Sequence, residues 1–105
     1  MELSALDKYR DQEILSKDGM FMIRVYSEDD CSSMERDIKD LFPHVRNFEI
    51  IGTLASGDMI LKRGEQIVVV LHDSGEELVS PLGFRQLIDL IEDRADDFES
   101  LVYGE

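Results

Sequence analysis

The side chains with the greatest potential for chemistry are one cysteine and two histidines. A thiolate beside an imidazole can act as a nucleophile in acyl transfer, so Cys31 with His44 or His72 is one possible catalytic arrangement. Cys31, however, lies beside Met34 on the apolar side of a predicted helix, where a lone cysteine behaves as a small hydrophobic residue. We therefore expect Cys31 to be structural and its thiol to be unreactive.

The pair His72-Asp73 follows the most apolar predicted strand, and residues at strand ends often carry function. Such a pair could shuttle a proton or form half of a metal site. The chain has only 2 histidines and 1 cysteine, and they do not form the spaced cluster that zinc sites require. The sequence therefore predicts no metal site and no cofactor.

Glycines at turns raise the question of phosphate binding, but the chain contains neither of the two common glycine-rich phosphate motifs. These glycines are more simply explained as turn residues that need a positive φ. They are Gly52, Gly57, Gly64, Gly75 and Gly83.

Two carboxylate groups, Glu28-Asp29-Asp30 and Glu76-Glu77, suggest acid and base pairs or a two-metal site. The first group stands at the start of a predicted helix, where negative charge is favourable by about 0.3 to 1 kcal/mol. The second group falls in a predicted loop. The sequence therefore predicts no catalytic residue in either group.

The elements that would hold these residues begin with a predicted helix over residues 3 to 15. A turn follows at 16 to 19, and then a strand at 20 to 26 that only Arg24 interrupts. Ser27 caps a second helix, which Pro43 ends. Its apolar stripe consists of Cys31, Met34, Ile38, Leu41 and Phe42.

Three more strands are predicted at residues 48 to 54, 58 to 62 and 66 to 72, with turns at 55 to 57 and 63 to 65. Residues 67 to 71 are all apolar, which indicates burial on both faces by helices or by a second subunit. Ser80-Pro81 resembles the start of a last helix. Its apolar side consists of Phe84, Leu87, Ile88, Ile91, Ala95 and Phe98.

The element order α-β-α-β-β-β-α predicts an α+β fold, with helices packed on a mainly antiparallel sheet of about four strands. The length of 105 residues suits a single domain over residues 1 to 105. Where the first strand joins the sheet cannot be deduced from the pattern.

The charge of the chain limits its partners. With 24 acidic and 11 basic side chains, the net charge of -13 repels nucleic-acid phosphates and anionic lipids, so we expect no direct nucleic-acid or membrane partner. The N-terminus lacks the pattern of a signal peptide, no stretch is long and apolar enough to span a bilayer, and the single cysteine excludes an intramolecular disulfide. These features favour a cytoplasmic location.

The outer face of the last predicted helix carries a row of acids at helical spacing: Asp89, Glu92, Asp93, Asp96 and Glu99. These acids repel one another and, late in a helix, oppose its dipole, with Arg94 as the only nearby cation along the helix. Because this row of acids lowers the stability of the helix, its presence favours the hypothesis that a basic partner binds it. The alternative interpretation is a solvated surface that maintains solubility or suits high salt.

The leading hypothesis is a small binding protein, not an enzyme, whose acidic face occludes a basic surface of a nuclease or nucleic-acid-binding protein. Inhibitors, immunity proteins and phage-encoded anti-defence proteins work in this way. A dimerising structural or adaptor subunit is the first alternative, because the apolar strand at 67 to 71 could lie in a homodimer interface. The second alternative is a small enzyme that uses Cys31, His72 or Asp73.

Overall fold

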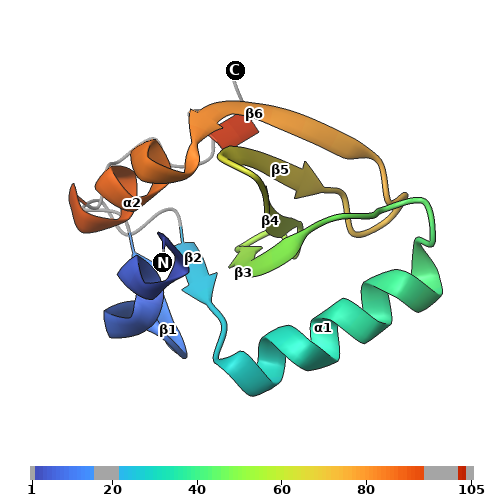
Figure 1. Cartoon of the computed structure of the whole chain (residues 1–105), viewed down its shortest axis with the longest axis horizontal. Coiled ribbons are helices and arrows are strands. Elements are labelled where there is room, and N and C mark those ends of the chain that lie inside the picture. Colours follow the sequence, from blue (N-terminus) through green and yellow to red (C-terminus); the bar gives the residue numbers. More distant parts are fainter. Residues whose placement is uncertain (1, 16–21, 94–101, 104–105) are drawn as a thin grey trace.

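An antiparallel sheet with a helix on each face organises the chain (Figure 1). The computed structural model describes residues 2–15, 22–93 and 102–103. Its elements are the 3-10 helix η1 (Glu2–Tyr9), β1 (Gln12–Leu15), β2 (Met22–Val25), α1 (Glu28–Leu41), β3 (Glu49–Leu54), β4 (Met59–Arg63), β5 (Gln66–Val70), β6 (Glu77–Gly83) and α2 (Phe84–Asp93).

The strands follow one another in chain order across the sheet, β1-β2-β3-β4-β5-β6, and every neighbouring pair is antiparallel. The predicted α+β class is confirmed. Over the described residues the sheet has six strands rather than about four. The segment of β1 was predicted as helix, and β6 spans a predicted loop and the predicted start of the last helix. The first predicted strand, now β2, joins the sheet between β1 and β3.

The prediction of a helix over residues 3 to 15 is wrong in its second half. The 3-10 helix ends at Tyr9, and Asp11 adopts a positive φ of 60° that turns the chain into β1. In β1 the buried Ile14 alternates with the exposed Glu13 and Leu15, which is the period of a strand. Pairing with β2 therefore overrides the loose helical spacing.

The second predicted helix is confirmed as α1. The Ser27 hydroxyl accepts a hydrogen bond from the Asp30 backbone N–H at 3.2 Å, and the helix ends at Leu41, two residues before Pro43. Along the predicted stripe Ile38 is buried, while Cys31, Met34 and Phe42 are half-buried against the same cluster. Leu41 departs from the prediction, because its side chain is 70% exposed at the end of the helix.

The last helix starts later than predicted, because Ser80 and Pro81 lie in β6. This strand is at the edge of the sheet, where a proline without a backbone donor is tolerated. The Gln86 side chain accepts a hydrogen bond from the Gly83 N–H at 2.7 Å, as the third helical residue does in a capping box. The helix therefore begins at Phe84, and its predicted apolar positions Ala95 and Phe98 lie outside the described residues.

Strand β5 is covered on both faces, as its apolar run predicts. Ile67 and Val69 pack in the cluster that includes α2, whereas Val68 and Val70 pack in the cluster that includes α1. All four side chains are at most 1% exposed, and only Leu71, beyond the strand, is half-buried. Helices of the same chain therefore supply the cover, and the burial of this strand does not require a second subunit.

Substitution of Val69 by Asp tests this two-sided burial. The change places an unpaired carboxylate in a fully buried position, so we expect the free energy of unfolding to fall by several kcal/mol or the domain not to fold. Val79→Asp is the matched control, because Val79 lies on the neighbouring strand β6 but is 58% exposed. Urea denaturation should leave the control close to the parent. Equal stability of the two variants would contradict the burial of β5.

Candidate functional site

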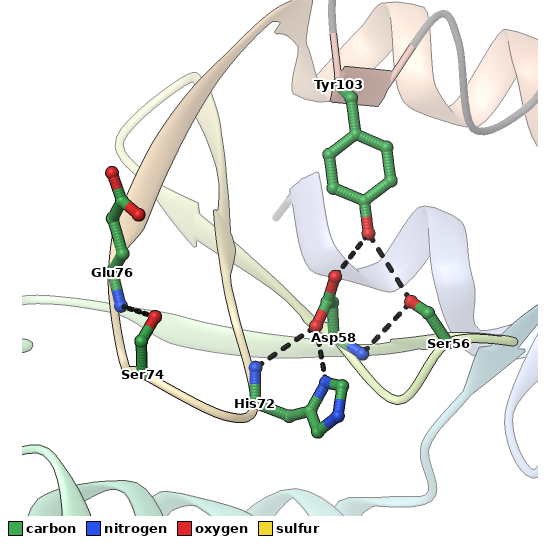
Figure 2. A network of polar contacts seen from close by, with 6 residues as sticks. All are labelled: Ser56, Asp58, His72, Ser74, Glu76 and Tyr103. Atoms are coloured by element: carbon green, nitrogen blue, oxygen red, sulfur yellow. Dashed lines mark hydrogen bonds and ion pairs between the residues drawn. The ribbon is translucent and has the colours of Figure 1, made fainter.

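Asp58, His72 and Tyr103 form a polar network at one end of the β4–β5 hairpin (Figure 2). One carboxylate oxygen of Asp58 lies 2.6 Å from His72 Nδ1 and accepts the His72 backbone N–H at 3.1 Å. The other accepts the Tyr103 hydroxyl at 2.5 Å. The Ser56 hydroxyl lies 3.4 Å from the Tyr103 oxygen and accepts the Asp58 N–H at 3.4 Å. Asp58 thus holds both His72 and the C-terminal Tyr103.

The hairpin register brings Asp58 and His72 together. Met59 pairs with Val70, so Asp58 immediately before β4 and His72 just after β5 lie at the same end of the hairpin. The sequence predicted this hairpin and singled out His72, but it missed Asp58 and Tyr103. Counting the register back from the turn at Gly64 would have placed Asp58 near His72, whereas no sequence signal points to Tyr103.

The network changes the pKa values of both ionisable partners. Burial alone raises the pKa of the Asp58 carboxyl, but hydrogen bonds from Tyr103 and His72 oppose it and leave this pKa below its ordinary value of 3.8. The hydrogen bond to Asp58 raises the pKa of His72 above its ordinary value of 6.5. Because an ionised Asp58 can only accept, the Nδ1–H of His72 donates the hydrogen bond between them.

An apolar groove lies beside His72. It encloses about 340 Å³ between α1 and the sheet, and His72 and Gly57 lie on its sheet side. Its apolar lining consists of Tyr26, Met34, Ile38, Leu41, Phe42 and Met59, and its polar lining also includes Asp37 and Thr53. A side chain of a bound molecule can therefore bury apolar surface beside an imidazole and a carboxylate.

The chemistry of this site is limited by what faces the imidazole. A histidine with Nδ1 on a carboxylate can act as a general base through Nε2. Within the described residues, however, no hydroxyl or thiol is hydrogen-bonded to that imidazole, and no three potential metal ligands gather in one place. Asp73, the other residue of the predicted pair, is exposed, and its negative charge adds to the raised pKa of His72.

The thiol of Cys31 is hydrogen-bonded to neither histidine. Its half-buried thiol donates to the Ile50 carbonyl at 3.5 Å and lines a separate cavity with Arg10. Burial raises the pKa of this thiol, although the nearby Arg10 guanidinium opposes the shift. His44 contacts the Gly75 carbonyl through Nε2 at 2.8 Å instead. The structure therefore does not form the predicted Cys-His alternative.

The predicted partner-binding face lies only partly within the described residues. Asp89, Glu92 and Asp93 are exposed on α2, while Asp96 and Glu99 fall outside the described part of the chain. Lys8 of the 3-10 helix pairs with Glu92 at 3.1 Å. Tertiary packing therefore brings a cation to this row from the N-terminal segment, in addition to those along the helix. The sequence did not predict this contact.

A second acidic surface lies on α1, and its extent was missed by sequence reasoning. The carboxylates at the start of the helix are exposed, as are Asp37 and Asp40 further along. On this helix Glu35 forms an ion pair with Lys39 at 3.1 Å. Asp37 also lines the apolar groove, so acidic and apolar surface adjoin along this helix.

The contribution of the Asp58–His72 pair to stability depends on pH. A raised His72 pKa stabilises the fold below about pH 6.5 and loses this effect as pH rises through the raised value. A lowered Asp58 pKa stabilises the fold above about pH 3.8 and loses this effect as pH falls through the lowered value. The pair is therefore most stabilising between these limits.

An NMR titration of His72 tests the network. We expect its midpoint above pH 6.5 in the parent and at a lower pH in Asp58→Asn, because the amide removes the carboxylate that favours the imidazolium. Tyr103→Phe is the control, since Tyr103 contacts Asp58 rather than His72 and most of the shift should remain. An unchanged midpoint in Asp58→Asn would contradict the pairing.

Phe42, which lines the groove, packs closely against Gly75. Gly75 has a φ of +75°, and a Cβ there would lie 2.3 Å from the Phe42 ring. Gly75→Ala should therefore lose more stability than Gly64→Ala, where φ is +64° but nothing lies within 4 Å of the added Cβ. The strain common to both substitutions is about 1–2 kcal/mol. Equal losses in urea denaturation would show that Phe42 moves aside without cost.

Comparisons of the chain with models of protein families, with curated proteins and with solved structures found no match. Within the described residues, no helix is both long enough and apolar enough to cross a membrane.

Proposed function

We propose that this chain is an acidic protein-binding module that occludes a basic, nucleic-acid-binding or nuclease surface of another protein. Its mode of action would be that of inhibitors, immunity proteins and phage anti-defence proteins. Such a module needs no catalytic residue, because binding alone prevents the partner from reaching its nucleic acid.

The observation that carries the proposal is how unevenly the charges are paired. Ion pairs with acidic residues involve Lys8, Arg10, Arg24, Lys39, Lys62 and Arg63. Seven exposed carboxylates on the helices form no ion pair with a described residue. They are Glu28, Asp29, Asp30, Asp37, Asp40, Asp89 and Asp93. Most of the exposed carboxylates without an ion pair to a described residue thus lie on the two helices. Each helix also carries an exposed arginine, Arg36 or Arg85, and Asp73 and Glu76 add negative charge after β5.

The exposed surfaces of the two helices suit recognition of a basic partner. Opposite charge steers two proteins together and raises the association rate by about one to three decades without an elaborate site. The sequence placed the contact on α2, and this stays a prediction. The α1 surface is the second candidate for the contact, since five of these seven carboxylates belong to it.

The two alternatives have less support. The apolar run that favoured a dimerising subunit is buried by the chain's own helices. A catalytic His72 would need a nucleophile to activate, and no nucleophile among the described residues is hydrogen-bonded to its imidazole.

Capture at low and high ionic strength, followed by mass spectrometry, would identify the partner. We expect a basic protein whose association rate falls steeply with salt, because exposed charges are screened beyond about 8 Å at physiological ionic strength. Asp89→Asn with Asp93→Asn tests α2, and Asp37→Asn with Asp40→Asn tests α1. At least one pair should slow association several-fold at low salt.

The control is Asp11→Asn with Glu13→Gln, which removes the same charge from acids already paired with Arg24. It should slow association less than the variant of the contact face. An association rate that is independent of ionic strength in the parent would overturn the proposal.

A further inference from the structure

A second hollow of different character lies next to the apolar groove beside α1. This second hollow, of about 280 Å³, is lined by Asp30, Ser33 and Arg24, together with Tyr26, Met34 and Asp37, which it shares with the apolar groove. Leu41 and His72 line only the first hollow. The two neighbouring hollows therefore form a depression along α1 with an apolar end and an acidic end.

The acidic end has a net negative charge despite the presence of Arg24. The Arg24 guanidinium forms ion pairs with Asp11 at 3.2 Å and with Glu13 at 3.3 Å. These two carboxylates, in β1 and the turn before it, offset its positive charge. Asp30 and Asp37 are exposed and form no ion pair with a described residue. They are seven residues apart, which places them on the same side of α1, about two helical turns from one another. A cation in this hollow would face both carboxylates.

The apolar end presents Leu41, which is 70% exposed although it belongs to the apolar stripe of α1. Leaving a leucine in water forgoes the free energy that its burial would contribute, about 25 cal/mol for each Å² of apolar surface. Leu41 forms one wall of the groove, with Phe42 beside it, so an inserted apolar side chain would cover its surface. His72 closes this end with a polar ring that Asp58 holds in place.

We infer that this depression is the contact site for a segment of the basic partner that carries a large apolar side chain next to Lys or Arg residues. The inference rests on the proposed function and adds the chemistry of recognition to it. The apolar side chain lies against Leu41 and Phe42, and the cationic side chains reach Asp37 and Asp30. Long-range charge brings the partner to the surface, and the apolar anchor selects the segment that remains bound.

Two synthetic peptides test the site. Both carry four lysines, and one has a central phenylalanine where the other has serine. We expect the phenylalanine peptide to bind the parent about tenfold more tightly, as for a buried aromatic anchor. NMR shift changes should centre on Met34, Asp37 and Leu41. The result that overturns the inference is equal affinity of the two peptides, or shift changes centred on Asp89 and Asp93 of α2.

Leu41→Asn removes the apolar wall at an exposed position, so the fold should survive. It should abolish the preference for phenylalanine while leaving the serine peptide unaffected. Val79→Asn is the matched control, because Val79 is also a large exposed apolar residue, 58% exposed, but lies on β6. It should keep the preference. A preference that survives Leu41→Asn, or that Val79→Asn removes as well, would overturn the inference.

Failure of the site and failure of the proposed function give different results. If both peptides bind equally and in a salt-sensitive way, the groove is not the anchor, but charge-driven binding stands. If the captured partner associates independently of salt, the proposed function fails as well. Concentration-dependent self-association that Leu41→Asn abolishes would make a second copy of this chain the occupant and would also overturn the inference.

Discussion

Burial of the sheet on both faces is the constraint on which the rest of the structure depends. Strand β5 directs Ile67 and Val69 to one apolar cluster and Val68 and Val70 to the other, so each face needs its own cover. The helix α2 covers the face of Ile67 and Val69, and α1 covers the face of Val68 and Val70. Because both helices direct their apolar sides inward, their charged sides form much of the surface. Many of the exposed carboxylates are therefore divided between the outer sides of the two helices.

The same constraint creates the polar network and the groove. The register that buries β4 and β5 also brings the residues flanking them together at one end, where Asp58 contacts His72. The helix α1 covers its face incompletely near its C-terminal end, and a depression remains between Leu41 and His72. The imidazole of His72 is thus held in place next to apolar surface.

Local patterns predicted the elements whose signals do not depend on distant residues. Ser27 and Pro43 bound α1 through short-range sterics and hydrogen bonding, and the apolar residues of β5 indicated its two-sided burial. The errors occurred where local and tertiary preferences compete. Ile14 joins a strand because β2 offers it a partner, and Ser80-Pro81, a common helix start, extends an edge strand because β5 lies beside it. Neither partner is visible in a local window.

The sequence by itself determined the sign and amount of charge, the α+β class and the burial of residues 67 to 70, because composition and periodicity follow from residue type alone. Only the tertiary structure decided which charges are paired and which hollows exist. Lys8 neutralises Glu92, and Tyr103 contacts Asp58, across more than forty intervening residues. Leu41 belongs to an apolar stripe by its spacing, yet it remains exposed because no described segment covers the end of α1. Such contacts depend on where distant segments meet in space, and no residue type encodes that by itself.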